Sequence, residues 1–95
     1  MTAMVVSNDL AAFGLMSYFS EAGIRIPEDM SLVSFDNTRL SQAGIIPLTT
    51  IDAHVEDMGR IAAELMVRRI QDPASERQRV VLDPKLIVRN STRHL

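Results

Sequence analysis

The 95-residue sequence contains no cysteine and no tryptophan, and it has only four glycines and four prolines. Without cysteine the chain forms no disulfide, no thiolate metal site and no thiol nucleophile, a composition that fits a cytoplasmic protein. Aromatic residues make up 4% of the chain, so aliphatic side chains and six methionines must form the core. No apolar run approaches the roughly 20 residues that span a bilayer, and no secretory signal is visible. We therefore expect no membrane partner.

The charge of the chain is nearly balanced, with ten Lys and Arg residues against twelve Asp and Glu residues and a net charge of −2 at pH 7. Direct binding of nucleic acid requires a basic patch that neutralises phosphates, and this composition offers none. A chain of this length can bury roughly two-thirds of its unfolded surface, which is enough for one modest core. The composition therefore predicts one small domain that does not itself bind DNA.

The first third of the sequence has the pattern of a strand, a helix and a second strand. Residues 3–7 form a short, apolar, partly β-branched segment, as in a strand that is buried on both faces. Over residues 10–22 the apolar positions recur at spacings of three and four, which predicts a helix, and Gly23 is well suited to end it. Residues 31–35 form the next predicted strand. This βαβ unit implies parallel pairing and a right-handed crossover.

The rest of the chain continues the alternation of strands and helices. Residues 52–71 carry an apolar stripe on one face and charged residues on the other, which predicts a long amphipathic helix. Proline at position 73 ends this helix, because it cannot continue the hydrogen-bond ladder. The polar tail from Asn90 is expected to fray. Three further β-prone segments are predicted as strands, at residues 48–51, 80–82 and 86–88. The fold class is therefore α/β with a parallel sheet.

Polar side chains follow the first two predicted strands at the point where each strand ends. Asn8 and Asp9 come after the first strand, and Asp36 and Asn37 come after the second. Ligands of open parallel α/β sheets bind at the carboxyl ends of the strands, so these clusters are expected to share one edge. Their short donors and acceptors suit a polyhydroxylated molecule or a nucleobase. A phosphate site would usually show a glycine-rich loop, and none is present.

Purely structural interpretations of the same residues remain open. Asn8 or Asp9 can simply cap the following helix, because Asn and Asp are among the preferred N-cap residues. Asp36 and Asn37 can form a turn after the strand, since these residue types dominate turns. His54 has no second histidine at metal-like spacing, so no metal site is predicted.

An enzymatic function is not indicated, and no cofactor is predicted. The sequence has no nucleophile elbow, no phosphate-binding loop of the Walker type and no zinc-protease motif. A phospho-acceptor domain would need an acidic pair after the first strand and a lysine after a later strand. The only lysine is Lys85, near the end of the chain.

Five blocks of sequence follow one another in order over nearly the whole chain. Residues 2–14 read TAMVVSNDLAAFG, and residues 21–36 read EAGIRIPEDMSLVSFD. Residues 47–51 read PLTTI, residues 86–92 read LIVRNST, and residues 58–70 lie in the predicted long helix between them. Together these five blocks resemble the C-terminal part of the effector-binding domain of the lactose/galactose repressor (LacI/GalR) family.

This resemblance implies an α/β fold of the periplasmic-binding-protein type, with a parallel sheet in three layers, of which only the C-terminal portion is present. Members of the family are bacterial transcription regulators. They carry an N-terminal helix-turn-helix and a two-lobed domain that closes on a sugar or nucleobase. Closure shifts a dimer between DNA-bound and released states. The resemblance therefore implies a small-molecule effector, a homodimer and operator DNA bound through a helix-turn-helix that this chain lacks.

The resemblance also implies roles for individual residues. It places Asn8 and Asp36 at the effector cleft, with Asn37 and Thr38 beside it. It places a dimer interface on the first helix and on residues 40–46, which includes Leu10, Phe13 and Ile45. On this map residues 1–51 and 85–95 belong to the C-terminal lobe and residues 54–83 to the N-terminal lobe. The chain crosses between the lobes at Asp52, Ala53, Asp83 and Pro84.

The sequence departs from the family pattern at several positions. Met1 stands where proline is frequent and Ser34 where glycine is usual, while Gly44 replaces a frequent aromatic residue and Ile46 a proline. The matched region is only the last third of a family member, so we interpret the chain as a fragment. Such a fragment leaves the apolar stripe of the long helix without a partner, which predicts a homodimer or a larger assembly with exchanged elements.

Two alternatives from other classes remain. The first is a fragment of a periplasmic solute-binding protein of a transporter, which has the same bilobal architecture. The second is an oligomerisation module without a ligand.

Overall fold

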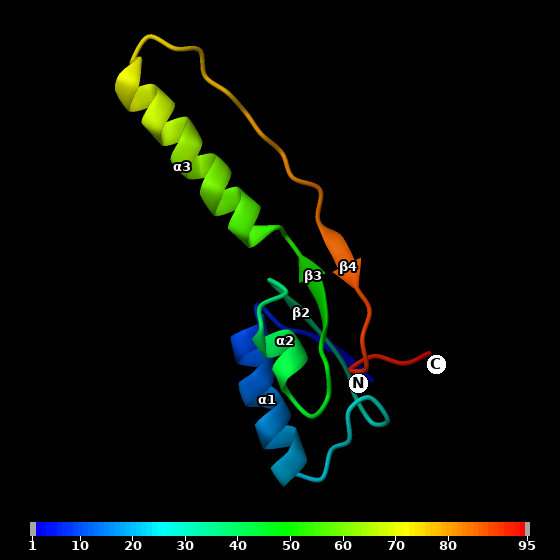
Figure 1. Cartoon of the computed structure of the whole chain (residues 1–95). Coiled ribbons are helices and arrows are strands. Elements are labelled where there is room, and N and C mark those ends of the chain that lie inside the picture. The colour runs from blue at the N-terminus through cyan, green and yellow to red at the C-terminus, as the bar shows by residue number, and fades with distance from the viewer. Residues whose placement is uncertain (1, 95) are drawn as a thin grey trace.

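The computed structural model describes residues 2–94 and shows a small α/β body from which a long helical arm projects (Figure 1). The elements are β1 (Ala3–Val5), α1 (Asp9–Glu21), β2 (Ser31–Phe35), α2 (Leu40–Ala43), β3 (Thr49–Asp52), α3 (Val55–Gln71) and β4 (Lys85–Ile87). The molecule measures 58 × 23 × 19 Å, with a radius of gyration of 17.7 Å. A compact domain of this length would have a radius of about 12 Å. The arm therefore lies outside any common core with the body.

The four strands form one sheet in the order β1-β2-β3-β4. β1, β2 and β3 are parallel, with Val5 opposite Val33 and Val33 opposite Thr49. This confirms the predicted α/β class with a largely parallel sheet. β4 runs antiparallel to β3, with Thr50 opposite Ile87, a direction that the sequence analysis did not predict. The reason is that α3 carries the chain away from the carboxyl end of β3 and the return segment comes back to that same end.

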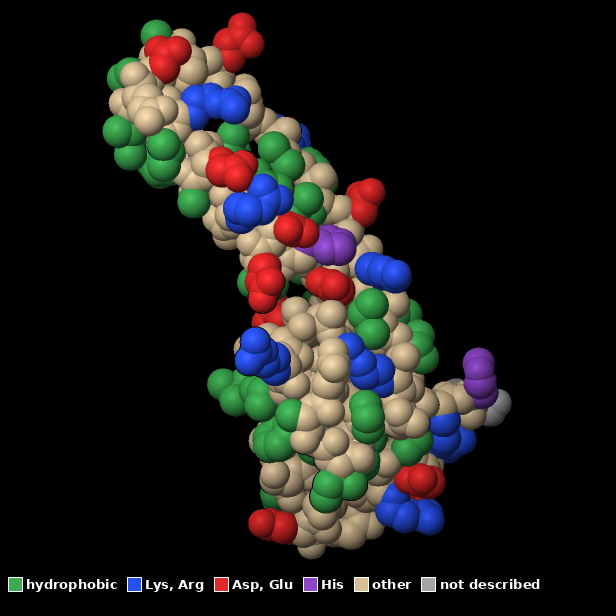
Figure 2. All heavy atoms as spheres, viewed as in Figure 1, with side chains coloured by type: hydrophobic (Ala, Val, Ile, Leu, Met, Phe, Trp, Pro, Cys, Tyr) green, Lys and Arg blue, Asp and Glu red, His purple; other side chains and the backbone are tan. Residues whose placement is uncertain are grey.

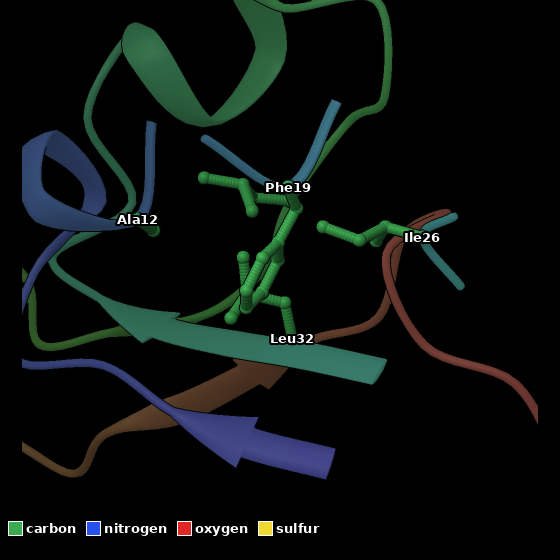
Figure 3. Close-up of a cluster of buried hydrophobic side chains, with 5 residues drawn as sticks. Ala12, Phe19, Ile26 and Leu32 are labelled. Atoms are coloured by element: carbon green, nitrogen blue, oxygen red, sulfur yellow. The ribbon is translucent and has the colours of Figure 1, made fainter. Parts of the chain in front are cut away.

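The core lies between α1 and the sheet (Figure 3). Ala12 and Phe19 from α1 are buried against Leu32 of β2, and Ile26 and Leu48 complete the cluster. The bounds of α1 agree with the sequence prediction to within one residue, whereas α3 begins three residues later than predicted, because Asp52 belongs to β3 and His54 turns the chain. α1 is capped at its N-terminus by Asn8, and Gly23, with a φ of 74°, turns the chain just after it. Only a residue that tolerates this left-handed conformation fits there without strain.

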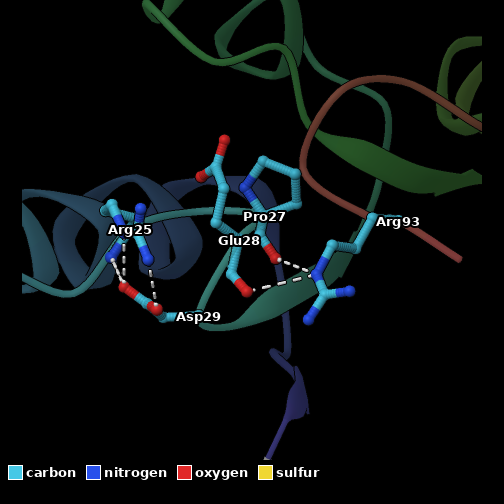
Figure 4. A network of polar contacts seen from close by, with 5 residues as sticks. All are labelled: Arg25, Pro27, Glu28, Asp29 and Arg93. Carbon is cyan, nitrogen blue, oxygen red and sulfur yellow. Dashed lines mark hydrogen bonds and ion pairs between the residues drawn. The ribbon is translucent and has the colours of Figure 1, made fainter. Parts of the chain in front are cut away.

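The connection from α1 to β2 is held by arginine side chains (Figure 4). Arg25 and Asp29 form a bidentate ion pair with N···O distances of 3.0 Å. Hydrogen bonds from Arg25 lower the pKa of Asp29 to about 2. Arg93 Nε donates to the carbonyl oxygens of Pro27 and Glu28 at 3.1 and 3.2 Å. The C-terminal segment is thereby fixed to the turn that leads into β2.

The expected fraying of the C-terminal tail is wrong for residues 91–93. Ser91 is fully buried, and its hydroxyl donates to the carbonyl of Leu32 at 2.6 Å. The backbone N–H of Thr49 donates to the same hydroxyl at 2.8 Å. The tail therefore bridges β2 and β3 through one polar side chain. A polar composition does not reveal such a role, because Ser is equally common in frayed ends.

The predicted strand at residues 80–82 does not form. Val80 and Leu82 of this segment line a groove that has Met58, Ile61 and Leu65 on its other side. A strand needs a neighbouring strand to satisfy its backbone groups, and among residues 2–94 none lies beside this segment. The one-turn helix α2 was not predicted, since it is too short to show a period.

The arm has no buried residue along its whole helix. Figure 2 shows hydrophobic side chains exposed on it among charged ones. Met58 and Met66 are both more than half exposed, and Val67 and Ile70 are exposed as well. Helices in proteins gain most of their stability from packing an apolar face, so this stripe is a surface in need of a partner.

The packing predicts the effect of a core truncation. Leu32 has no exposed surface. Leu32→Ala is expected to lower the free energy of unfolding by about 2–5 kcal/mol, through lost transfer energy and a residual cavity. Urea denaturation followed by circular dichroism measures it. The control is Val81→Ala on the exposed return segment, which is expected to change little. Equal midpoints for the two variants would contradict this core assignment.

Candidate functional site

The two polar clusters that follow β1 and β2 meet at one edge of the sheet, as predicted. Parallel pairing of Ala3 with Ser31 brings the carboxyl ends of both strands to this edge. Contact between the clusters is direct: the Asp9 carboxylate accepts from the backbone N–H of Thr38 at 2.6 Å and from the Thr38 hydroxyl at 2.9 Å. The loop after β2 is thus tied to the first turn of α1.

Asp9 is the most buried charged group at this edge, with no exposed surface. Besides Thr38, it accepts hydrogen bonds from the hydroxyls of Ser34 on β2 and Thr50 on β3. Burial by itself raises the pKa of this carboxyl, but the hydrogen bonds from Ser34, Thr38 and Thr50 outweigh burial and lower the pKa below its ordinary value. The carboxylate therefore joins one helix, two strands and one loop in its charged form.

Asn8 takes the structural role that the sequence left open for it. Its side-chain oxygen accepts the backbone N–H of Ala11 at 2.8 Å, so it is the N-cap of α1. The side chain is half-buried at the edge of the sheet. Among residues 2–94 its amide nitrogen donates no hydrogen bond, and this group remains available to a ligand.

Asp36 and Asn37 form the turn after β2, and both have positive φ angles, of 102° and 53°. The backbone N–H of Asp36 donates to the carbonyl of Ile51 at 2.9 Å, which holds the turn against β3. Within the described part of the chain, the half-buried Asp36 carboxylate accepts no hydrogen bond. An unpaired carboxylate on a fixed backbone is suited to receive hydroxyl or N–H donors from a bound molecule.

Asn37 differs from Asp36 because both ends of its amide are already bonded. Its oxygen accepts from Arg89 Nη2 at 2.7 Å and from the Ser41 hydroxyl at 3.2 Å. Its nitrogen donates to Asp52 at 3.3 Å. A role of Asn37 in ligand contact stays a prediction. Asp9 and Arg89 were not predicted as organising residues, although both stand in blocks that carry the family resemblance.

The two segments predicted to cross between lobes lie side by side. Asp52 is paired in register with Lys85, so Ala53 on one segment and Asp83 and Pro84 on the other flank the root of the arm. The backbone N–H of His54 donates to Asp52 Oδ1 at 2.9 Å. This bond lowers the pKa of Asp52. His54 itself has a φ of 55° and begins α3.

The residues predicted for a dimer interface are exposed. Ile45 is fully exposed, at 102% of its reference area, and Leu10 is 70% exposed. Phe13 lines a groove of about 670 Å³ together with Met16, Ile45 and Ile46. This groove lies between the flank of α1, the segment that follows α1 and residues 44–46 after α2. An apolar surface of this kind is typical of a protein interface.

Two further observations concern residues 2–94. No group of three or more histidine, aspartate or glutamate side chains could hold a metal ion. None of the helices is both long enough and apolar enough to cross a membrane.

A family model described as the periplasmic binding protein-like domain matches residues 1–92. The chain belongs to this family. By sequence it is 36% identical to the transcriptional repressor PurR of Photobacterium profundum and 38% identical to PurR of Vibrio cholerae. Each match covers 99% of this chain and 28% of the relative. The chain therefore spans less than a third of the length of the curated relatives it matches.

The chain is also similar in structure to solved transcription regulators. The chain is 40% identical to a LacI family transcriptional regulator from Enterococcus faecalis with bound ribose, with a TM-score of 0.91. It is 36% identical to one from Enterococcus faecium with bound ribose, also with a TM-score of 0.91. Both matches cover 96% of this chain and 34% of the regulator. The resemblance to the lactose/galactose repressor family is confirmed, and these relatives favour a regulator fragment over a transport-protein fragment.

The buried carboxylate predicts how stability depends on pH. Asp9→Asn leaves buried hydroxyl and amide donors short of acceptors, and is expected to lower the free energy of unfolding at pH 7 by about 1–3 kcal/mol or more. Because folding lowers the pKa of Asp9, its stabilisation is present above the unfolded pKa, near 4, and is lost as the pH falls through the folded value. Asp9→Asn has no carboxylate to protonate at this position. The difference in free energy of unfolding between the unmodified chain and the variant is therefore expected to shrink in acid.

Urea titrations from pH 2 to 7 measure the difference. The matched control is Asp57→Asn on the arm, which removes an exposed ion pair with Arg60 at 3.6 Å and is expected to cost at most about 1 kcal/mol. A difference between wild type and Asp9→Asn that stays constant with pH would contradict the assignment.

Proposed function

We propose that this chain is the effector-sensing and dimerising part of a bacterial transcription regulator, and that it is not an enzyme. The observation that carries the proposal is the Asp36 carboxylate. It is half-buried at the carboxyl edge of the sheet, lies on a backbone held by Ile51, and has no partner within residues 2–94. A half-exposed carboxylate without a partner in the chain, on a backbone that is already held, is able to accept hydrogen bonds from a bound molecule.

The ligand class follows from the chemistry of the two free groups. The Asp36 carboxylate accepts hydrogen bonds only, and the Asn8 amide nitrogen donates them. Together they suit a neutral molecule that carries several donors and an acceptor, such as a sugar or a nucleobase. Regulators similar to this chain have been solved with ribose, and one similar regulator with cellobiose. Both ligands are polyhydroxylated, which supports the sugar class.

The shape of the molecule supports the division into lobes. Residues 1–51 and 85–95 are assigned to a C-terminal lobe, of which residues 2–51 and 85–94 are described. Residues 54–83 are assigned to an N-terminal lobe. α3 and its return segment project from the body without any buried residue in the helix, as expected of elements whose partners lie in another part of a longer protein. Asp52, Ala53, Asp83 and Pro84 are then the crossings between the lobes.

The proposal also covers the partners of the chain and its cellular location. The chain forms a homodimer through Leu10, Phe13 and Ile45, and it acts in the cytoplasm. Its net charge of −2 offers no footprint for DNA. Operator recognition is therefore assigned to residues of a parent regulator outside this chain. In an electrophoretic shift assay, the 95 residues alone are expected to leave DNA unshifted.

The proposed site predicts the effect of removing one charge. Asp36→Asn keeps a residue type that tolerates positive φ but loses the charged acceptor, and is expected to weaken ligand binding about ten- to a hundredfold. Isothermal titration with ribose, cellobiose and purine bases measures the affinity. Asp57→Asn on the arm is the control and is expected to bind as the unmodified chain does. Unchanged affinity of Asp36→Asn would remove Asp36 from the site.

The proposed interface predicts a change of assembly without a change of fold. Ile45 is fully exposed, so Ile45→Glu costs no packing within the chain but places a charge in the proposed dimer contact. The unmodified chain is expected to be a dimer at micromolar concentration and the variant a monomer, by light scattering. Val81→Glu on the return segment is the control. A monomeric unmodified chain, or a variant that stays dimeric, would contradict this interface.

A further inference from the structure

The direction of the arm is fixed by very few contacts. α3 buries no residue, so no apolar core joins it to the body. What connects them is the chain itself, through the pair of strands β3 and β4 and the turn at His54. The geometry of this turn therefore determines where α3 points. The groups that hold the turn can be followed through one series of hydrogen bonds.

The series begins at the turn. Asp52 uses both of its carboxylate oxygens: Oδ1 accepts from the His54 backbone N–H at 2.9 Å, and Oδ2 accepts from Asn37 Nδ2 at 3.3 Å. The first bond fixes the residue that precedes α3. The second bond ties the same carboxylate, at the end of β3, to the loop that follows β2.

Behind Asn37 stands Arg89, which comes after β4. Its Nη2 donates to the Asn37 oxygen at 2.7 Å, and its Nη1 donates to the Ser41 hydroxyl and the Leu48 carbonyl at 2.8 and 2.9 Å. The guanidinium is therefore held at several points and cannot rotate freely. It presents one N–H group to Asn37 in a fixed direction, which in turn orients the Asn37 amide toward Asp52.

The backbone conformation also distinguishes the residues of this hydrogen-bonded series. The structure has three residues other than glycine with a positive φ within residues 2–94, namely Asp36, Asn37 and His54. Asn37 and His54 lie within the hydrogen-bonded series, and Asp36 adjoins it. Strained backbone persists only where its surroundings hold it, and it concentrates where a protein positions a functional group.

We propose that Arg89 and Asn37 are positioning residues that set the direction of α3 through Asp52 and His54. The relay, defined as Arg89–Asn37–Asp52–His54, joins the loop that bears Asp36 to the root of the arm. Its consequence for ligand response rests on the proposed function. A ligand bound to Asp36 would act on the adjacent Asn37 and, through the relay, on the direction of the arm. The relay itself is a property of the unliganded chain.

The test measures the direction of the arm in the unliganded 95-residue chain. Since the sequence has no cysteine, two introduced cysteines carry spin labels without competing sites. Gly14→Cys on α1 places a side chain where no atom lies within 4 Å, and Ala63→Cys lies on the exposed face of α3. Double electron–electron resonance then gives the distance between body and arm. Dilution with unlabelled chain removes distances between protomers.

The unmodified pair is expected to give one narrow distance distribution. Asn37→Ala and Arg89→Ala are expected to broaden it, because the turn loses its support. Asn37→Asp is expected to shift the mean as well, since it places a second carboxylate against Asp52. Asp52→Asn keeps the size of the side chain but removes its charge, and it is measured beside the other variants. If one of the other variants loses helix content, this isosteric change still tests the relay.

The matched control is Asn90→Ala, one residue after Arg89, on an exposed side chain that makes no hydrogen bond within residues 2–94. It is expected to leave the distribution unchanged. Distributions of Asn37→Asp and Asp52→Asn that match the unmodified chain, with equal helix content by circular dichroism, would overturn the proposal. No ligand is present in this measurement, so a failure of the relay is distinct from a failure of the Asp36 binding test.

Discussion

The buried carboxylate of Asp9 is the interaction on which the carboxyl edge of the sheet depends. It accepts four hydrogen bonds, from Ser34, Thr50 and both the N–H and the hydroxyl of Thr38. Hydrogen bonds to charged groups contribute about 1.5–3 kcal/mol each, more than most single contacts in so small a core. The five buried apolar residues hold α1 onto the sheet, and Asp9 ties the first turn of α1 to Thr38 in the loop after β2. The bonds of Asp36 to Ile51 and of Asn37 to Arg89 then hold the rest of this loop.

The sequence predicted the elements of the body well, because its apolar periodicity is strong and local. α1, β2 and the parallel pairing of β1 with β2 follow from spacing and from the length of the crossover. The shared edge of the two polar clusters follows from that pairing. The two predictions that are wrong, the strand at residues 80–82 and the frayed tail, depend on groups that are distant in sequence. Residues 80–82 have the composition of a strand but lack a neighbour within the described residues, and the tail is held by Ser91, whose burial depends on Leu32 and Thr49.

Asn8 and Asp36 are predicted as site residues because Asn and Asp at strand ends have a known chemistry, and their contact with a ligand stays a prediction. The side chains that hold them in place were not predicted. Asp9 was interpreted as a possible cap, yet its neighbour Asn8 caps the helix and Asp9 turns inward. A buried Ser34 and a buried Thr50 on adjacent strands are hydroxyls that need an acceptor, and this requirement could have pointed to Asp9. Arg89 acts 52 residues away from Asn37, a distance that no local pattern reveals.

The proposed response of this edge to a small molecule depends on the balance of free energies at the root of the arm. Positive φ at a residue other than glycine costs about 1–3 kcal/mol, although Asp, Asn and His tolerate it better than most residues. The hydrogen bond from Asn37 to the Asp52 carboxylate has a charged acceptor, and bonds of this kind contribute about 1.5–3 kcal/mol. A ligand can shift an equilibrium only by its difference in affinity for the two states. One or two charged hydrogen bonds from Asp36 to a ligand supply a free energy of the same size as the bonds that hold the arm. Because α3 has no core to resist such a change, the loop after β2 is where the proposed ligand would act on the arm with the least opposition.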